Sequence, residues 1–168
     1  MLSNENFTVR PLPTIVFNRG AAKDLNNHIQ ALGKNAALIV TDKNLAASGV
    51  LDPILEALRA ANLSVEVVDG VEPNPTDLNV EAGAAKLKEL GDAVVVPIGG
   101  GSSMDCGKSI ALLASNPGTV EEMQGSVPTP AAAPVIAVPT TAGTGSETNS
   151  ACVITNTCLL YTSPSPRD

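Results

Sequence analysis

The residues of this sequence best suited to chemistry lie in one glycine-rich run, Gly99-Gly100-Gly101-Ser102-Ser103-Met104-Asp105. The run follows an apolar segment at 93–98 and precedes apolar residues at helical spacing, so we expect a turn from a strand into a helix. Glycines let the backbone turn sharply and approach a ligand, while the start of a helix offers unpaired N–H groups and a positive dipole end. Phosphate is the natural ligand of such a turn, and a tight turn without a ligand is the alternative.

Neither of two common phosphate-binding patterns is complete in this run. The G-x-G-x-x-G pattern lacks its third glycine, because Met104 stands there. The pattern G-x-x-x-x-G-K-[ST] ends correctly at residues 107–109, but it needs a glycine where Ser102 stands. A slip of one residue redirects the N–H groups, so a nucleotide hydrolase is kept only as an alternative. Lys108 is then expected to lie inside the helix as a solvated lysine.

Three polar residues lie at or near the ends of expected elements. Asp42 directly follows an apolar run, where its carboxylate would accept hydrogen bonds from ribose hydroxyls and repel a 2′-phosphate. It therefore favours NAD over NADP, and a helix cap or turn is the alternative. Asn74 lies in the rigid turn at 73–76. Asp105 complements the helix dipole, but beside a phosphate its charge must be satisfied by neighbouring groups.

A loop dense in hydroxyl groups follows the apolar run at 135–138. It reads TTAGTGSE over residues 140–147, and its glycines allow it to wrap around a ligand. We expect the loop to line a ribose or a nicotinamide, and a flexible loop without a ligand is the alternative.

The surrounding elements alternate between strands and helices. Strands are expected at 14–17, 36–41, 64–68, 93–98, 135–138 and 152–155, and helices at 20–32, 51–61, 76–90 and 103–115, with an irregular excursion at 116–134. This alternation predicts an α/β fold of Rossmann-like type, a mostly parallel sheet with helices on both faces. Asp42, the glycine run and the loop at 140–147 then fall on one edge of the sheet, where such folds bind ligands.

Composition limits the function further. The net charge of −7 argues against nucleic acid as a partner, because nucleic acid needs a basic surface. The three cysteines, Cys106, Cys152 and Cys158, form no C-x-x-C pair, and no signal or membrane-spanning run is present, so a reduced, cytoplasmic setting without membrane contact is expected. A single histidine, His28, excludes a histidine-rich metal site within this chain.

The last residues differ from the rest of the sequence. Residues 1–156 are expected to form one dinucleotide-binding domain. Residues 157–168 have neither amphipathic period nor cap, and we interpret them as a non-native tail of an out-of-frame or adapter-derived origin. A natural flexible terminus is the alternative.

Together these segments resemble the iron-type alcohol dehydrogenases, which are metal-dependent enzymes. The resemblance rests on Asp42, PNPT at 73–76, GGGSSMD at 99–105, PTTAGTGSE at 139–147 and CVIT at 152–155. It implies a nucleotide-binding α/β domain, followed in the family by an all-helical domain that this chain lacks. It also implies homo-oligomers that transfer hydride between NAD(P) and small alcohols or aldehydes, with a divalent metal, iron or zinc, in the full-length enzymes.

The resemblance also implies specific roles. The expected cofactor-binding residues are Asp42, Asn74, Gly100, Gly101, Ser102, Ser103, Met104, Asp105, Thr140, Thr141, Gly143 and Thr144. Asp42 is placed near the adenosine ribose, residues 100–105 around the pyrophosphate, and the threonines along the nicotinamide side. The family's metal ligands come from the helical domain, so no catalytic or metal residue is expected here.

This chain is therefore predicted to bind NAD at best and not to catalyse the turnover of a substrate. A non-catalytic nucleotide-binding module remains an alternative, as do the related polyol dehydrogenases and dehydroquinate synthases, although the loop at 140–147 suits the alcohol enzymes better.

Overall fold

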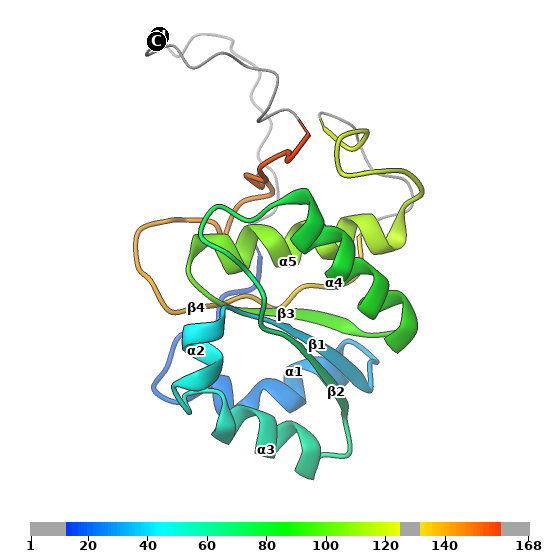
Figure 1. Ribbon diagram of the computed structural model, residues 1–168. Helices are drawn as coiled ribbons and strands as arrows, with labels where there is room; N and C mark the ends of the chain where they lie inside the picture. The colour runs from blue at the N-terminus through cyan, green and yellow to red at the C-terminus, as the bar shows by residue number, and fades with distance from the viewer. Residues whose placement is uncertain (1–12, 125–131, 159–168) are drawn as a thin grey trace, which may run out of the picture.

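A parallel sheet of four strands lies at the centre of the computed structural model, which describes residues 13–124 and 132–158 (Figure 1). The strands are β1 (Ala36–Val40), β2 (Ser64–Val68), β3 (Val94–Gly99) and β4 (Val138–Pro139). Their order in the sheet is β2-β1-β3-β4, and Ile39 of β1 pairs with Val67 on one side and Val96 on the other. All the pairs are parallel, so the carboxyl ends of the strands share one edge.

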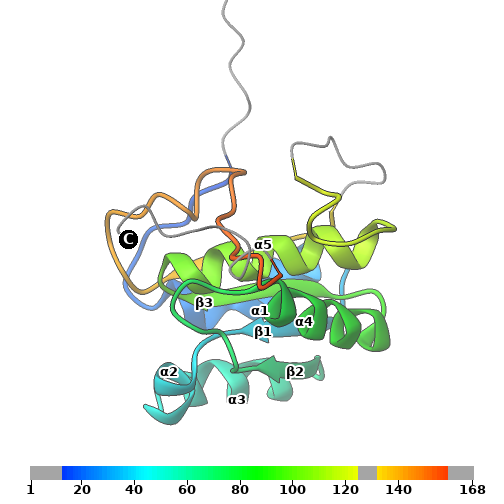
Figure 2. The ribbon, with the colours of Figure 1, turned by 45° about the horizontal axis from the view of Figure 1, so that its top comes forward.

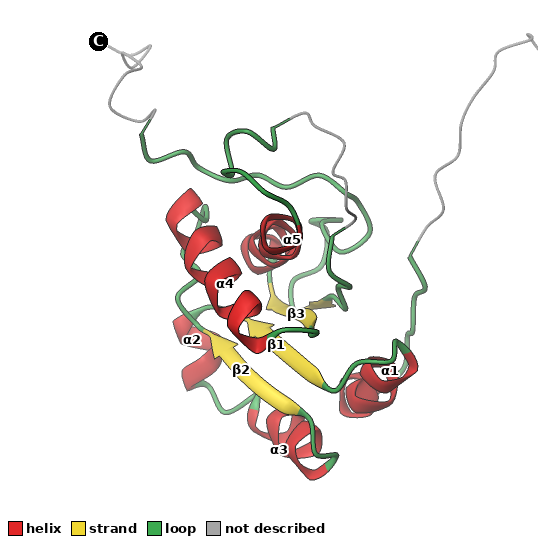
Figure 3. Ribbon diagram, turned by 90° about the vertical axis from the view of Figure 1, so that its right-hand side faces the viewer, coloured by secondary structure: helices red, strands yellow, loops and turns green. Residues whose placement is uncertain are grey.

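Helices cover both faces of this sheet (Figures 2 and 3). The helices are η1 (Ala21–Asp24), α1 (Leu25–Ala31), α2 (Lys43–Ala47), α3 (Asp52–Ala60), α4 (Asp77–Leu90) and α5 (Gly101–Ser115). Helices α4 and α5 pack side by side on one face, and α1 and α3 lie on the other. The predicted α/β class, with a parallel sheet between helical layers, is confirmed.

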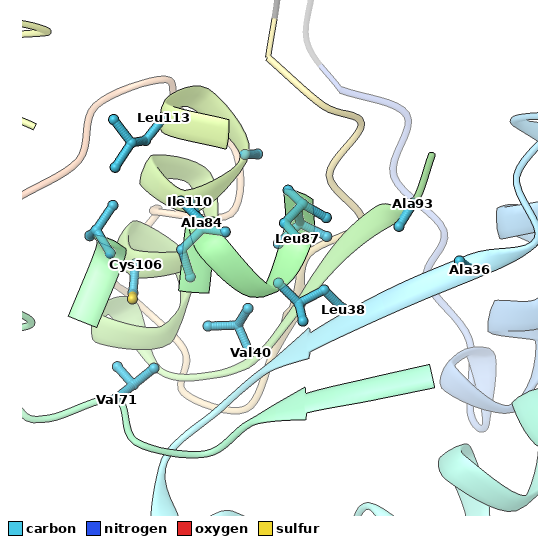
Figure 4. Close-up of a cluster of buried hydrophobic side chains, with 13 residues drawn as sticks. Ala36, Leu38, Val40, Val71, Ala84, Leu87, Ala93, Cys106, Ile110 and Leu113 are labelled. Carbon is cyan, nitrogen blue, oxygen red and sulfur yellow. The ribbon is translucent and has the colours of Figure 1, made fainter. Parts of the chain in front are cut away.

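The alternation of side chains along β1 explains the two layers. Leu38 and Val40 face α4 and α5, where they join a buried cluster with Leu87 and Ile110 (Figure 4). Ala37 and Ile39 point the opposite way and join the cluster under α1 and α3. A central parallel strand is buried on both faces, and this is why residues 36–40 are apolar without interruption.

Two expected strands are absent from the sheet. Residues 14–17 form no strand, and Phe17 is 98 % exposed. An apolar run with β-branched residues forms a strand only beside a neighbouring strand, and no strand of the described residues pairs with residues 14–17. Residues 152–155 provide only a bridge between Thr155 and Thr76, because the segment runs along the starts of α4 and α5 instead.

Other boundaries also differ from the expected ones. Of the strand at 135–138, only Val138 belongs to β4, and Val135 bridges to Val95. Helix α5 begins at Gly101 rather than at 103, and α2 was not expected. Thr157 is hydrogen-bonded to Asp77 of α4 at 3.2–3.3 Å. Part of the excursion at 116–134 and of the tail at 157–168, namely 125–131 and 159–168, lies outside the described residues.

Candidate functional site

Three segments meet at the carboxyl edge of the sheet. The N–H of Thr140 donates to the carbonyl of Gly99 at 2.8 Å, which ties the loop after β4 to the end of β3. A β-carbon added at Gly100 would lie 3.3 Å from Thr141 Oγ1, and one at Gly101 would lie 3.4 Å from Thr144 Cγ2. Residues 140–144, the threonine loop, therefore lie directly against the glycine turn, as the sheet topology predicted.

Asp42 lies at the same place, at the end of β1. Its Oδ1 accepts hydrogen bonds from the backbone N–H groups of Asn44 and Leu45, at 2.9 and 3.0 Å, and so caps α2. Its Oδ2 lies 3.9 Å from the position of a β-carbon on Gly99. One oxygen of this carboxylate thus serves as the helix cap, and the other is directed toward the glycine turn.

The N-terminus of α5 differs from those of its two neighbours at this edge. Helix α2 is capped by Asp42, and α4 carries a capping box in which Thr76 and Asn79 bond to each other's backbone N–H groups. The N-cap residue of α5 is Gly100, and no side chain of the described residues caps this helix. The first turn of α5 therefore presents its N–H groups and its positive dipole end to the space at the sheet edge.

The glycine turn admits no side chain at its first position. Gly99 has a φ of 150°, and a β-carbon there would lie 2.9 Å from Ser103 Cβ and still closer to the Ser103 hydroxyl. Ser103 and Met104 are themselves buried beneath the turn, whereas Ser102 is half-buried. Of the residues expected around a pyrophosphate, Ser103 and Met104 consequently offer backbone groups rather than side chains.

Asn74 stands apart from this arrangement. It is exposed in the loop between β2 and α4, and its φ of 59° is unusual for a residue other than glycine. No hydrogen bond within the described residues joins it to the glycine turn. Gly143 has a φ of 98° and open space around its α-carbon, and it forms the bend of the threonine loop.

Lys108 is not the solvated lysine that the sequence led us to expect. Its side chain is only 17 % exposed, and its ammonium lies 3.1 Å from Asp105 Oδ1, one helical turn away. The segment after the threonine loop folds back over α5 and surrounds the ammonium with oxygens of Ser146, Asn149 and Ala151. The Asp–Lys spacing was a detectable signal, but these distant partners were not.

Residues 107–109 lie inside α5 and not in a phosphate-binding loop. A β-carbon at Gly107 would come within 2.8 Å of Pro97 Cβ on β3, so this glycine allows the helix to lie close to the sheet. The glycine–lysine–serine sequence therefore serves helix packing and the contacts of Lys108.

Two cysteines lie near Asp105 and Lys108, and both are poor nucleophiles. Burial, together with the neighbouring Cys152 and Asp105, raises the pKa of Cys106 from 9.0 to about 12. Burial also raises the pKa of Cys152, although a hydrogen bond with Ser109 and the charge of Lys108 oppose that rise. Because the thiolate is the reactive form, neither residue is suited to nucleophilic catalysis at neutral pH.

Within residues 13–124 and 132–158, no three His, Cys, Asp or Glu side chains gather in a way that could hold a metal ion. None of the helices in the same ranges is both long and apolar enough to cross a membrane.

Comparison with known proteins adds independent evidence. The family model for iron-containing alcohol dehydrogenase matches residues 13–159. The chain is 41 % identical over 154 residues to the NAD-dependent methanol dehydrogenase of Bacillus methanolicus, covering 90 % of this chain and 40 % of that protein. The chain thus spans about 40 % of the length of the curated relatives that it matches.

Solved structures agree with this result. A crystal structure of 1,3-propanediol oxidoreductase matches with a TM-score of 0.81 and 40 % identity, covering 90 % of this chain and 40 % of that one. The sulfoacetaldehyde reductase of Bifidobacterium kashiwanohense, solved in complex with NAD⁺, matches with a TM-score of 0.76 and 31 % identity, covering 83 % and 37 % of the two chains.

Proposed function

The chain belongs to the iron-containing alcohol dehydrogenase family, and we propose that it forms the dinucleotide-binding part of an enzyme that transfers hydride between NAD and small alcohols or aldehydes. The observation that carries this proposal is the uncapped N-terminus of α5, which lies under the threonine loop at the carboxyl edge of the sheet. Unpaired N–H groups and a positive dipole end suit a pyrophosphate, and they do so without a cluster of lysines.

Each part of the cofactor is assigned to a group of residues at this edge of the sheet. We assign the pyrophosphate to the first turn of α5, where Gly100 and Gly101 leave room and Ser102 adds a hydroxyl group. Asp42 Oδ2 is assigned to the adenosine ribose, and its negative charge disfavours the 2′-phosphate of NADP. The hydroxyl groups of the threonine loop, from Thr140 to Thr144, are assigned to the nicotinamide side, and Asn74 to the outer face of the cofactor.

The described residues do not fit the divalent metal that the family uses, because they contain no group of three suitable ligands. In the family the metal polarises the alcohol oxygen and favours the alkoxide that gives up hydride. We therefore assign to this chain the binding and orientation of the cofactor, and we expect no turnover of alcohol by the 168-residue chain alone.

Titration of the 168-residue chain with NADH and NADPH, followed by isothermal calorimetry, tests this proposal. We expect one saturable site that prefers NADH. The Gly101→Ala variant places a methyl group in ordinary contact with Thr144, at 3.4 Å, yet on the face assigned to the pyrophosphate. It should fold normally and bind NADH about tenfold more weakly, because the added methyl group keeps the pyrophosphate away from the N–H groups. A tenfold loss corresponds to roughly one charge-assisted hydrogen bond.

Gly70→Ala is the matched control, because a β-carbon there meets no atom within 4 Å. It should bind NADH as the unmodified chain does. Absence of saturable NADH binding, or equal loss in both variants, would overturn the assignment of the site. Oxidation of alcohol by the isolated chain, followed as NADH absorbance, would overturn the expectation of no turnover.

A further inference from the structure

Lys108 lies at the centre of a cluster of oxygen atoms on the second turn of α5. Its ammonium is 2.8 Å from the carbonyl of Ser146, 3.0 Å from the Ser146 hydroxyl, and 2.5 Å from the carbonyl of Ala151. The carbonyl and side-chain oxygens of Asn149 follow at 3.4 and 3.3 Å. A single cation thus faces five oxygens from one segment, residues 146–151, in addition to the carboxylate of Asp105 at 3.1 Å.

Asp105 contacts the first residue of this segment and a residue just beyond its end. Its Oδ1 accepts the hydroxyl hydrogen of Ser146, and its Oδ2 accepts the backbone N–H of Val153 at 3.0 Å. Both side chains of the pair are largely withdrawn from solvent, at 15 and 17 % exposure. Hydrogen bonds to charged groups are stronger than neutral ones, and partial burial spares this pair most of the screening by water.

The segment has few other attachments to the fold. In the described part of the chain, the hydrogen bonds that join residues 141–151 to another element all end on Asp105 or Lys108. The remaining bonds are local, such as those from Thr148 and Asn149 to the carbonyl of Gly145. The position of this segment over α5 therefore depends on the charged pair.

The segment also connects directly to the threonine loop. The N–H of Ser146 donates to Thr144 Oγ1 at 3.3 Å, and Thr144 in turn lies against Gly101 at the start of α5. Figures 1 and 2 show the chain leaving β4, passing around the start of α5 and returning along the helix. The second turn of α5 thereby holds the loop that covers its first turn.

We infer that Lys108, paired with Asp105, is a positioning residue that fixes the threonine loop over the pyrophosphate site and so sets the affinity for the dinucleotide. This inference rests on the proposed function. Lys108 also balances the negative charge of Asp105, which would otherwise face a phosphate from the same helix. Lys108 touches neither cofactor nor substrate in this role, and it acts through Ser146 and Thr144.

The test compares Lys108→Ala with Lys86→Ala, an exposed lysine of α4 that makes one long hydrogen bond, of 3.5 Å, to the carbonyl of Val67. Hydrogen exchange without cofactor should show faster exchange of the amides at 144–153 in Lys108→Ala only. The dissociation constant for NADH should rise about tenfold or more in the same variant, as expected when a charged hydrogen-bonding group is removed. Adding n-propylammonium, which replaces the missing part of the side chain, should restore both properties in Lys108→Ala.

The outcomes separate this inference from the proposed function. If the unmodified chain does not bind NADH, the proposed function fails, while hydrogen exchange still tests the hold of Lys108 on the segment. If Lys108→Ala loosens the segment but binds NADH like the unmodified chain, the inference fails and the proposed function stands. Unchanged hydrogen exchange in Lys108→Ala, or no rescue of this variant by n-propylammonium, also overturns the inference.

Ser146→Ala provides a milder variant, should Lys108→Ala fail to fold. It removes the hydroxyl that contacts both Lys108 and Asp105 while leaving the charged pair intact. Faster exchange at 144–153, together with weaker NADH binding than in the unmodified chain, would support the inference. Unchanged exchange and unchanged binding in this variant would contradict it.

Discussion

Gly107 of α5 lies on Pro97 of β3 so closely that a β-carbon on the glycine would come within 2.8 Å of Pro97 Cβ. A second glycine makes a similar contact between helices, since a β-carbon on Gly83 of α4 would lie 2.7 Å from Ile110 Cγ1 on α5. These two contacts bring α5 close to both the sheet and α4. They fix the direction in which the helix projects its N-terminus over the sheet edge.

The first prediction concerns this packing. Gly107→Ala should lower the free energy of unfolding, because the rigid proline ring cannot move away and overpacking typically costs about 1–3 kcal/mol. The gain in helix propensity, about 1 kcal/mol, opposes this cost, so we expect a net loss of up to about 2 kcal/mol. Urea denaturation measures the difference, with Gly70→Ala as the control. A Gly107→Ala chain at least as stable as the unmodified one would contradict the close packing.

The second prediction separates the two oxygens of Asp42. Asparagine is as good an N-cap as aspartate, so Asp42→Asn should keep the stability of the chain to within about 0.5 kcal/mol, whereas Asp42→Ala should lose about 1 kcal/mol. Asp42→Asn nevertheless removes the negative charge directed toward the glycine turn. We expect it to bind NADPH relatively better, shifting the ratio of NADH to NADPH affinity about tenfold.

Calorimetric titration with both cofactors, alongside urea denaturation, checks this prediction. An unchanged affinity ratio in Asp42→Asn would restrict Asp42 to its cap on α2. Loss of NADH binding in Asp42→Ala alone, accompanied by unfolding, would say nothing of the ribose, and this is why the asparagine variant carries the test.

The third prediction concerns the dependence of stability on pH. Below pH 9.0, the Cys106 thiol is protonated in both folded and unfolded chains, so its contribution to stability is complete. Above pH 9.0, the unfolded thiol ionises while the buried thiol stays protonated up to about pH 12, and stability falls over this interval. The slope for one such group approaches about 1.4 kcal/mol per pH unit.

Urea denaturation of the unmodified chain and of Cys106→Ala, between pH 8 and 11 in steps of about half a unit, isolates this contribution. The difference between the two free energies should be constant below pH 9.0 and should shrink above it, because only the unmodified chain carries the titrating thiol. Parallel curves across the whole range would show that Cys106 titrates in the folded chain as it does in the unfolded one.

Local patterns were enough to predict most of the fold. The uninterrupted apolar runs at 36–41 and 93–98 marked the two central strands, and the glycine run between 99 and 105 marked the turn into α5. Parallel topology then required that the ends of these strands share an edge. The family followed from the same motifs, whereas the roles assigned to individual cofactor-binding residues remain predictions.

The errors share one physical cause, which is dependence on distant partners. Residues 14–17 have the composition of a strand, yet a strand exists only beside another strand, and none of the described strands lies there. Residues 152–155 look similar, but their backbone groups bond to Asp105 and to the loop before α4. The composition of a short stretch of residues does not determine whether its backbone groups will pair with another strand.

By itself, the sequence determined the order of the elements, the parallel sheet and the place of the glycine turn, because these depend on periodicity and on glycine's freedom within a few residues. Only the tertiary structure decided that α5 is left uncapped between two capped neighbours, and that Lys108 is withdrawn from solvent. The exposure of a lysine side chain depends on which part of the chain folds over it. Over Lys108 this part lies 38–43 residues away in the sequence, in a segment that by itself is typical only of a polar loop.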